Sequence, residues 1–215
     1  MKPYLLFDFD GTVADSIGKL FTMINELAPR YGYQPISEET FSQLRNLNLC
    51  QSFRHLKIPL YKLGQAIPIV LHEYRKIIPE LDPCPGILPV LETLKKRGIS
   101  MALISSNQTE NVQEFLDRHG IDCFAWVEGT GGILKKHNKI TRQIVKHGLI
   151  RKDVIYIGDE SRDIKAARKS RVKVISVTWG FHSAEHLARH KPDYLAASPD
   201  ELLKIVLNIS AQALA

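Results

Sequence analysis

Short apolar runs alternate along most of the chain with segments whose apolar residues recur at helical spacing. The runs have the length of strands, and their lack of polar alternation is typical of strands that are covered on both faces. We expect such strands at residues 4–9, 100–105, 124–128, 154–157 and 172–177. Because helices lie between them, the pattern predicts an α/β fold with a Rossmann-like parallel sheet flanked by helices.

Local signals mark the ends of several expected helices. Residues 87–97 and 107–119 each precede a glycine, which favours the backbone turn that ends a helix. The second of these starts at Asn107, where Asn-x-x-Glu is a variant of the capping box. A last helix is expected after Ser198, where Ser-Pro-Asp-Glu combines a capping box with proline at the first helical position.

The stretch 16–81 breaks the alternation, because it shows helical patterns and no convincing strand. One apolar face consists of Ile17, Phe21, Ile24 and Ala28, and a second of Ile67, Val70, Leu71, Tyr74 and Ile78. Prolines and a glycine then mark the return to alternation. We therefore expect an α/β core formed by residues 1–15 and 82–215, and a small helical domain, residues 16–81, inserted after the first strand.

The composition is that of an ordinary globular protein, with 215 residues of which 44% are hydrophobic and 24% charged. No apolar run is long enough to cross a bilayer, and the short run at the N-terminus lacks the form of a signal peptide. The three cysteines are widely spaced and include no C-x-x-C pair, which argues against a disulfide framework or a zinc site. We predict a cytoplasmic protein with no membrane partner.

The net charge of +6 is compatible with solvated helix faces and with a positive field that attracts anionic substrates. Basic residues are dense between Lys135 and Lys173. No recognised nucleic-acid motif accompanies this charge, so we do not expect nucleic acid as a partner.

Two carboxylates, Asp8 and Asp10, come at the end of the first apolar run. Burying two carboxylates close together is costly without a cation, and Mg²⁺ with oxygen ligands is the usual solution beside phosphate. One carboxylate can then act as a nucleophile while the other exchanges protons, and Gly11 lets a phosphate approach the backbone. Two solvated aspartates in a tight turn are the alternative, which is weakened because matching polar groups follow later strands.

Four segments, in this order, resemble the motifs of the haloacid dehalogenase superfamily. They are Asp8-Phe9-Asp10-Gly11-Thr12-Val13, Ile104-Ser105-Ser106-Asn107, the pair Lys135-Lys136, and Gly158-Asp159-Glu160-Ser161-Arg162-Asp163. The helical insert sits where the superfamily places its C1-type cap, and residues 177–181 and 192–194 resemble phosphoglycolate phosphatases in particular. Each motif alone is weak, whereas the ordered set of four, which spans nearly the whole chain, is specific.

The resemblance implies that these groups meet at one edge of the sheet, outside the carboxyl ends of the strands. Asp8 would be the nucleophile, and Asp10 the general acid and base. Mg²⁺ would bind Asp8, the backbone carbonyl of Asp10, and Asp159. Ser105 and Lys136 would stabilise the charge of the phosphoryl group.

Further residues follow from the same resemblance. Substrate contacts are expected from Gly11, Thr12, Ser106 and Asn107. Asp163 would hold either the water shell of the metal or Lys136, although a carboxylate is also favoured in the first turn of a helix. Lys136 is preferred to the adjacent Lys135 because a polar helix start follows it.

The helical insert supplies the residues that would select the substrate. Arg45 is the candidate contact, with Arg54 and Lys57 as weaker ones, although a solvated charge is the alternative for each. His182, His186 and His190 are spaced by four and are interpreted as an exposed helix face rather than as metal ligands.

The function that the resemblance implies is a Mg²⁺-dependent phosphatase, which hydrolyses a small anionic phosphomonoester through a phosphoaspartyl intermediate on Asp8. Phosphoglycolate, a sugar phosphate and a nucleotide are all open as substrates. A phosphomutase shares the four motifs and differs in whether water reaches the phosphoaspartate. A non-catalytic protein that binds a phosphorylated ligand is the alternative from another class, and the intact set of Asp8, Asp10, Ser105 and Asp159 argues against it.

Overall fold

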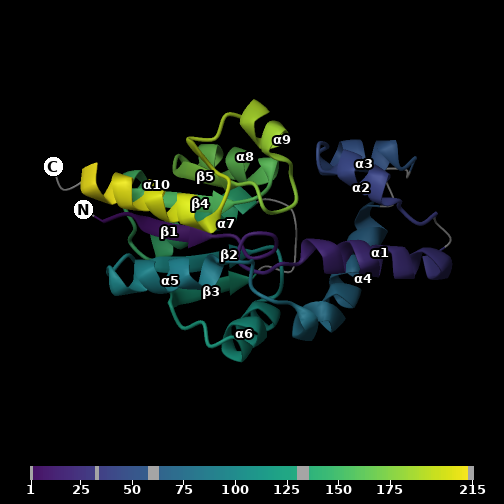
Figure 1. The fold of residues 1–215 in the computed structure, drawn as a ribbon, viewed down its shortest axis with the longest axis horizontal. Coiled ribbons are helices and arrows are strands. Elements are labelled where there is room, and N and C mark those ends of the chain that lie inside the picture. The colour runs from purple at the N-terminus through teal and green to yellow at the C-terminus, as the bar shows by residue number, and fades with distance from the viewer. Residues whose placement is uncertain (1, 32–33, 58–62, 130–135, 213–215) are drawn as a thin grey trace.

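A computed structural model describes residues 2–31, 34–57, 63–129 and 136–212 of the chain. Over these residues the strands form one parallel sheet in the order β3-β2-β1-β4-β5-β6 (Figure 1). The strands are β1 (Tyr4–Phe7), β2 (Met101–Ser105), β3 (Phe124–Gly129), β4 (Val154–Gly158), β5 (Lys173–Val177) and β6 (Tyr194–Ala196). The predicted α/β fold with a parallel sheet is confirmed.

The strand order reverses at β1, which lies between β2 and β4. Phe7 at its end pairs with Leu103 on one side and with Ile157 on the other, so the carboxyl ends of the three strands lie within two residues of one another. A reversal of this kind leaves a crevice outside the strand ends where ligands bind. The fold thus places the residues that follow β1, β2 and β4 at one position.

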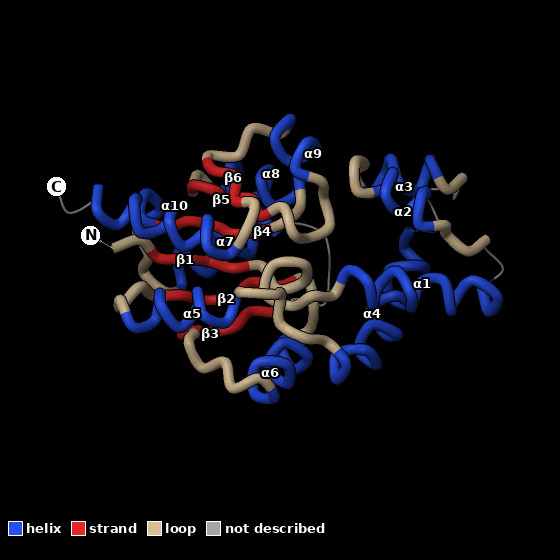
Figure 2. The backbone as a smooth tube through the Cα atoms, viewed as in Figure 1, coloured by secondary structure: helices blue, strands red, loops and turns tan. Residues whose placement is uncertain are grey.

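Helices cover both faces of the sheet (Figure 2). One face packs against α5 (Ile87–Lys96), α6 (Thr109–Arg118) and α10 (Pro199–Gln212), and the other against α7 (Lys136–Lys146), α8 (Ser161–Ser170) and α9 (Ala184–Arg189). Leu5 and Phe7 point to the first face and Leu6 to the second, and all three are fully buried. Burial on both faces explains the uninterrupted apolar runs, because each such side chain contributes about 1.5–3 kcal/mol.

The helices of the insert lie at the end of the molecule opposite both termini (Figure 1). They are α1 (Ile17–Tyr31), α2 (Glu38–Leu44), α3 (Leu49–His55) and α4 (Leu63–Ile77), followed by the 3-10 helix η2 (Ile78–Glu80). Two chain segments connect them to the sheet and are hydrogen-bonded to each other, since the Asp15 amide donates to the Asp82 carbonyl at 2.8 Å and the Cys84 amide to the Val13 carbonyl at 2.8 Å. The described residues between 17 and 80 include no strand.

Several predicted boundaries were wrong. The first strand ends at Phe7 rather than at residue 9, and β6 was missed because it is only three residues long. Helix α6 has Gln108 rather than Asn107 as its N-cap, because the Asn107 side chain is bonded to Gln108 and Asn111 instead. At α10, Ser198 Oγ accepts from the Glu201 amide, but the Glu201 carboxylate accepts from Ala197, so only half of the predicted capping box forms.

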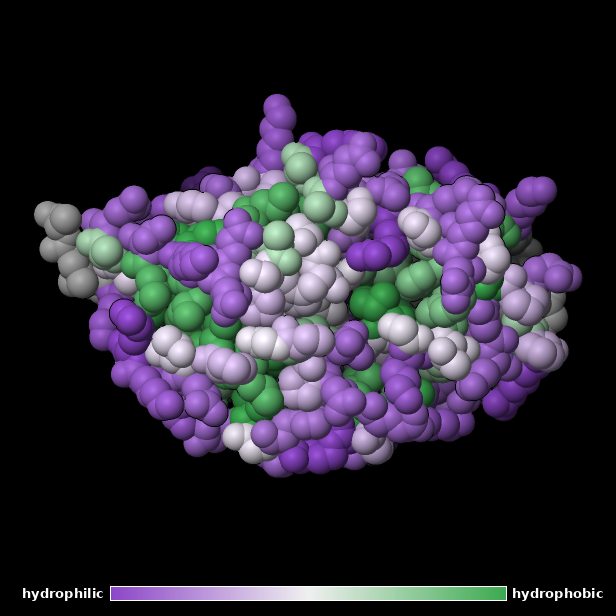
Figure 3. Space-filling model, viewed as in Figure 1, coloured by the Kyte–Doolittle hydropathy of each residue, from purple (hydrophilic) through white to green (hydrophobic). Residues whose placement is uncertain are grey.

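The surface in the view of Figure 1 is mostly hydrophilic, and polar residues separate the hydrophobic ones (Figure 3). None of the helices in the described part of the chain has the length and apolar character needed to cross a membrane. The three cysteines are free thiols, with Cys50 exposed, Cys84 buried and Cys123 half-buried.

Candidate active site

Asp8 is the first residue after β1, and only 3% of its surface is exposed. Its amide still donates to the Ile157 carbonyl of β4, at 2.8 Å, so its backbone is fixed by the sheet. One carboxylate oxygen, Oδ1, accepts from the Phe9 amide at 2.9 Å. The other, Oδ2, lies 2.5 Å from Lys136 Nζ. The carboxylate is therefore held in one orientation at the centre of the strand ends.

Lys136 is the first residue of α7, and 6% of it is exposed. Its ammonium group bridges two carboxylates, Asp8 at 2.5 Å and Asp163 at 2.6 Å, and lies 5.4 Å from the centre of the Tyr156 ring. Of the two adjacent lysines, Lys136 is thus the one seen beside Asp8, whereas Lys135 falls outside the described residues.

Three buried carboxylates cluster around this lysine. Asp8, Asp159 and Asp163 each offer an oxygen, and these oxygens lie within 4.8 Å of one another. A single ammonium group cannot neutralise three buried carboxylates, and burial without neutralisation is costly. A set of hard oxygen donors of this kind fits Mg²⁺. Asp8 and Asp159, the predicted side-chain ligands, are both members of the cluster.

Burial and mutual repulsion disfavour the ionised form of these carboxylates. Burial raises the pKa of Asp8 to about 7, while Lys136 opposes this shift and Asp163 adds to it. Burial also holds the pKa of Asp159 well above its usual range, helped by the negative charges of Glu160, Asp163 and Asp8. Burial lowers the pKa of Lys136, but the charges of Asp163 and Asp8 outweigh this and keep its pKa well above the usual value. A bound cation would favour the ionised carboxylates.

Asp159 follows β4 and is contacted by two other segments, one after β1 and one after β5. The Phe181 amide donates to its Oδ2 at 2.6 Å, and the Thr12 hydroxyl to its Oδ1 at 3.3 Å. Two glycines leave room for it: a Cβ on Gly11 would lie 2.3 Å from Asp159 Oδ2, and a Cβ on Gly180 2.2 Å from Asp159 Cβ. Gly11 also has a φ of +69°, which glycine adopts without strain. Thr12, predicted to contact substrate, is fully buried and supports Asp159 instead.

Asp163 both binds Lys136 and caps the start of α8. Oδ1 accepts from Lys136 at 2.6 Å, while Oδ2 accepts from the Glu160 amide at 3.0 Å and completes a capping box at the start of α8. The helix start thus fixes the carboxylate that holds the lysine. No part of Asp163 is exposed.

Ser105 is the last residue of β2, and its Oγ accepts from the Asn107 amide at 2.9 Å. Asn107 is 97% buried, since 3% of it is exposed. Its Oδ1 accepts from the Gln108 amide at 2.8 Å and from Asn111 Nδ2 at 2.7 Å, which fixes the direction of the side-chain amide. Its Nδ2 is buried and has no hydrogen-bond partner among the residues that the structure describes. Ser106, also predicted to contact substrate, is half-buried in the same loop.

Asp10 lies apart from these groups in its contacts. Its side chain is not one of the three clustered carboxylates, which is compatible with the predicted role of its backbone carbonyl as the ligand. The Tyr74 hydroxyl, from α4 of the insert, donates to Asp10 Oδ1. Burial raises the pKa of Asp10, and the hydrogen bond from Tyr74 opposes this shift. The sequence placed Tyr74 on an apolar face, and its contact with Asp10 was not predicted. The signal that could have indicated a polar contact is the hydroxyl, because a buried tyrosine usually forms a hydrogen bond through it.

Arg45 caps the end of α2 and connects the insert to the loop after β5. Its Nε donates to the Phe181 carbonyl and its Nη2 to the Gly180 carbonyl, both at 2.9 Å. The same loop orients Asp159 through the Phe181 amide. The structure therefore shows Arg45 bound to the loop. Arg54, the weaker candidate, is exposed.

The prediction that His182, His186 and His190 form an exposed helix face was wrong. His182 lies before α9 and is 2% exposed, and its Nδ1 accepts from the Ser161 amide at 3.0 Å while Nε2 lies 2.9 Å from the Leu47 carbonyl of the insert. One nitrogen accepts and the other must donate, so the ring is neutral, and burial lowers its pKa. His186 is also buried and stacks on His182 at 4.3 Å. A spacing of four did not reveal that this segment faces the insert.

Arg162 was also missed as a charge near the site. It bonds Glu160 at 2.5 Å, and the charges of Asp163 and Asp8 are close enough to raise its pKa, beyond what burial takes away. Arginine at a variable position of the motif gave no signal in the sequence.

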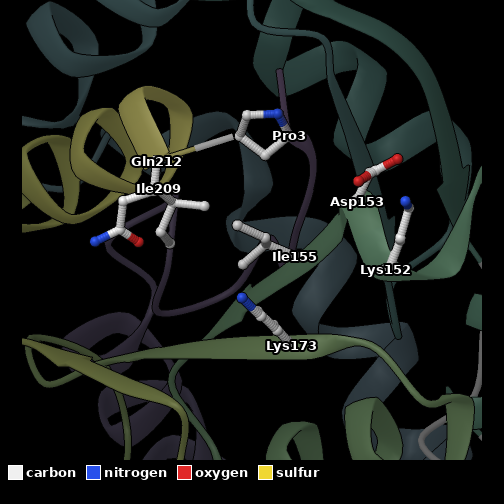
Figure 4. Close-up of a pocket in the computed structure, with 7 residues that line it drawn as sticks. All are labelled: Pro3, Lys152, Asp153, Ile155, Lys173, Ile209 and Gln212. Atoms are coloured by element: carbon white, nitrogen blue, oxygen red, sulfur yellow. The ribbon is translucent and has the colours of Figure 1, made fainter. Parts of the chain in front are cut away.

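A hollow of about 220 Å³ lies at the opposite edge of the sheet (Figure 4). It is lined by Pro3, Lys152, Asp153, Ile155, Lys173, Ile209 and Gln212. These residues come from the amino ends of β1, β4 and β5 and from α10, whereas the candidate catalytic residues follow the carboxyl ends. The hollow is therefore separate from the candidate site.

Comparison with known proteins agrees with this arrangement. The family model described as haloacid dehalogenase-like hydrolase matches residues 5–177. The chain belongs to this family. It is 32% identical, over 97% of its own length and 99% of the relative's, to the phosphoglycolate phosphatase of Synechococcus elongatus. It is 27% identical to that of Vibrio parahaemolyticus, with 94% and 95% of the two chains covered.

Among solved structures, a haloacid dehalogenase-like hydrolase from Streptococcus pneumoniae, SP0104, is similar with a TM-score of 0.79 and 25% identity. The alignment covers 95% of this chain and 98% of that one. The predicted identification as a phosphoglycolate-phosphatase-like hydrolase of this family is confirmed, and with it the prediction of an enzyme.

Proposed function

We propose that this hydrolase is a Mg²⁺-dependent phosphatase, which cleaves a small phosphomonoester through a phosphoaspartyl intermediate on Asp8. One observation carries the proposal: the buried Asp8 carboxylate lies 2.5 Å from Lys136, with oxygens of Asp159 and Asp163 within 4.8 Å. A nucleophile, a fixed cation and further metal ligands are thus combined at the carboxyl ends of the central strands. A protein that only binds its ligand would not need this group of buried carboxylates, whose burial costs free energy.

The metal belongs beside the clustered carboxylates. Asp8 and Asp159 would hold it through their side chains and Asp10 through its backbone carbonyl, while Asp163 orients Lys136. When bound, Mg²⁺ supplies positive charge that reduces the repulsion between an anionic nucleophile and an anionic substrate.

The reaction consists of two successive displacements at phosphorus. In the first, an Asp8 carboxylate oxygen bonds to phosphorus as the bond to the leaving oxygen breaks, and Asp10 gives that oxygen its proton. In the second, water attacks the phosphorus of the phosphoaspartate, Asp10 takes a proton from the water, and inorganic phosphate leaves with Asp8 restored. Asp10 is thus first a general acid and then a general base.

The remaining groups stabilise charge on the phosphoryl oxygens. Lys136 provides a buried cation next to the attacking carboxylate. The buried Asn107 Nδ2, which has no hydrogen-bond partner in the described part of the chain, is a donor held in place by the two bonds to Oδ1 of the same side chain. The Ser105 hydroxyl, at the end of β2 two residues before Asn107, is the predicted third donor. Fixed donors of this kind contribute about 10²–10³-fold each to the rate.

We propose phosphoglycolate as the first substrate to test, because the two curated relatives above are named for its phosphatase activity. Residues 16–81 would form the cap domain and residues 1–15 and 82–215 the core. The Arg45 bonds to the loop after β5 support a cap that docks over the site, and a direct contact of Arg45 with substrate stays a prediction. We also retain the cytoplasmic location as a prediction.

Phosphate release from a panel of phosphomonoesters, with and without Mg²⁺, tests the function. We expect release that requires Mg²⁺, that is largest with phosphoglycolate, and that is abolished in Asp8→Asn. Asp117→Asn, an exposed aspartate on α6, is the matched control and should keep full activity. A folded wild-type protein that releases no phosphate from any ester would contradict the proposal. Isomerisation of a sugar phosphate without net phosphate release would instead support the mutase alternative.

A further inference from the structure

Tyr74 lies on α4 within an apolar face, and its side chain is almost entirely buried, with 6% exposed. Its ring belongs to the hydrophobic cluster that also contains Phe9 and Ile78. Apolar packing accounts for the ring, but not for the hydroxyl. That hydroxyl donates to Oδ1 of Asp10, the proposed general acid and base.

A second hydroxyl reaches the same carboxyl from the other connection to the insert. Ser16 immediately precedes α1 and is 1% exposed. Its hydroxyl lies near the Asp10 carboxyl and the Tyr74 hydroxyl and acts to lower the pKa of both groups. The chain thus sends one hydroxyl to Asp10 just before the insert begins, and another from the last helix of the insert.

The other carboxylates of the site are held differently. Asp8 and Asp163 are fixed by Lys136, and Asp159 by the Phe181 amide and Thr12, all of which belong to the sheet or to the segments around it. Among the contacts above, only that of Asp10 comes from a helix of the insert. A rotation of α4 away from the sheet would therefore remove Tyr74 from Asp10, whereas the bonds to the carboxylates of Asp8, Asp159 and Asp163 given above come from no helix of the insert.

We propose that Tyr74 is a positioning residue, which orients the Asp10 carboxyl for proton transfer and makes that transfer depend on the docking of α4. This inference rests on the proposed phosphatase function. The Tyr74 hydroxyl should therefore affect the rate of phosphoryl transfer only for esters whose leaving oxygen needs a proton. An alkyl ester such as phosphoglycolate needs one, whereas p-nitrophenolate leaves as a stable anion.

The experiment compares kcat/KM for phosphoglycolate and for p-nitrophenyl phosphate in the wild type and in Tyr74→Phe. For each ester, kcat/KM reports the steps up to formation of the phosphoenzyme, in which Asp10 acts as an acid. We expect Tyr74→Phe to lower kcat/KM for phosphoglycolate about 10- to 100-fold and that for p-nitrophenyl phosphate by less than about twofold. Tyr194→Phe, which alters a half-buried tyrosine of β6, is the matched control and should change neither.

The outcomes separate the inference from the function on which it rests. Equal losses with the two esters, or no loss with either, would overturn the positioning role while leaving the phosphatase intact. Absence of phosphate release by the wild type would overturn the proposed function and this inference with it. If thermal unfolding shows that Tyr74→Phe is not folded, Ser16→Ala, which removes the other hydroxyl from Asp10, must show the same preference for the aryl ester.

Discussion

Replacing Lys136 by methionine removes the cation from the acidic cluster while nearly keeping the volume of the side chain. In the wild type its ammonium group lies 2.5 Å from Asp8 and 2.6 Å from Asp163, and all three side chains are buried. The variant leaves three carboxylates, with oxygens within 4.8 Å of one another, without the ammonium group that bridges two of them. We therefore expect a large loss of stability in metal-free protein.

The size of this loss follows from the burial. Removing one partner of a buried ion pair destabilises a protein by about 3–5 kcal/mol. For a chain of this length, 1 kcal/mol corresponds to a shift in Tm of roughly 2–4 °C, so the variant should unfold roughly 6–20 °C below the wild type. Mg²⁺ should raise the Tm of the variant more than that of the wild type, because the metal supplies charge to a site that has lost it.

Thermal unfolding at pH 7.5, with EDTA or with Mg²⁺, measures both effects. Lys146→Met, an exposed lysine at the end of the same helix, is the matched control and should shift the Tm by no more than about 2 °C. The reasoning is refuted if the two variants lose the same stability in EDTA, or if Mg²⁺ stabilises Lys136→Met no more than the wild type.

Three further predictions concern the loop after β5, the insert and helix α9. Gly180→Ala places a Cβ 2.2 Å from Asp159 Cβ and should raise the Mg²⁺ concentration needed for half-maximal phosphate release at least about tenfold, whereas Gly18→Ala, where the Cβ meets no atom within 4 Å, should leave it unchanged. Arg45→Met loses both hydrogen bonds to the loop carbonyls and should speed proteolysis of the insert, as measured by limited digestion, while equal cleavage rates would exclude a docking role. Burial lowers the pKa of His186 from 6.5 to about 4, so the unfolded chain takes up a proton on this imidazole at a higher pH than the folded chain does. The free energy of unfolding should therefore be highest above pH 6.5 and should fall as the pH is lowered from 6.5 to 4. Urea titration at several pH values measures this fall, which should be smaller in His186→Gln.

The sheet and the acidic cluster at the carboxyl ends of its central strands were predictable because they depend on local patterns. Strands buried on both faces need uninterrupted apolar runs, and a carboxylate at the end of such a run, as at Asp8, has few uses other than chemistry. The choice of Lys136 rested on a helix start that the structure also shows. These features are encoded within a few residues of one another.

What could not be predicted depends on contacts between distant segments. The apolar spacing of Tyr74 identified the buried face of α4 but not the carboxyl 64 positions away that its hydroxyl meets. Arg45 was predicted to contact substrate and His182 to be exposed, because nothing near them in the sequence identifies the loop after β5 or the Leu47 carbonyl as a partner. Strand β6 was too short for its own pattern to stand out.

The most direct test of the account is to trap the phosphoenzyme. Wild-type protein turning over phosphoglycolate with Mg²⁺ would be quenched in acid, digested and searched by mass spectrometry for a phosphorylated aspartate. We predict one phosphoryl group on the peptide that contains Asp8, and none in Asp8→Asn. Phosphate release at the wild-type rate with no modification of this peptide, or with the phosphoryl group on another residue, would contradict the claim that Asp8 is the nucleophile.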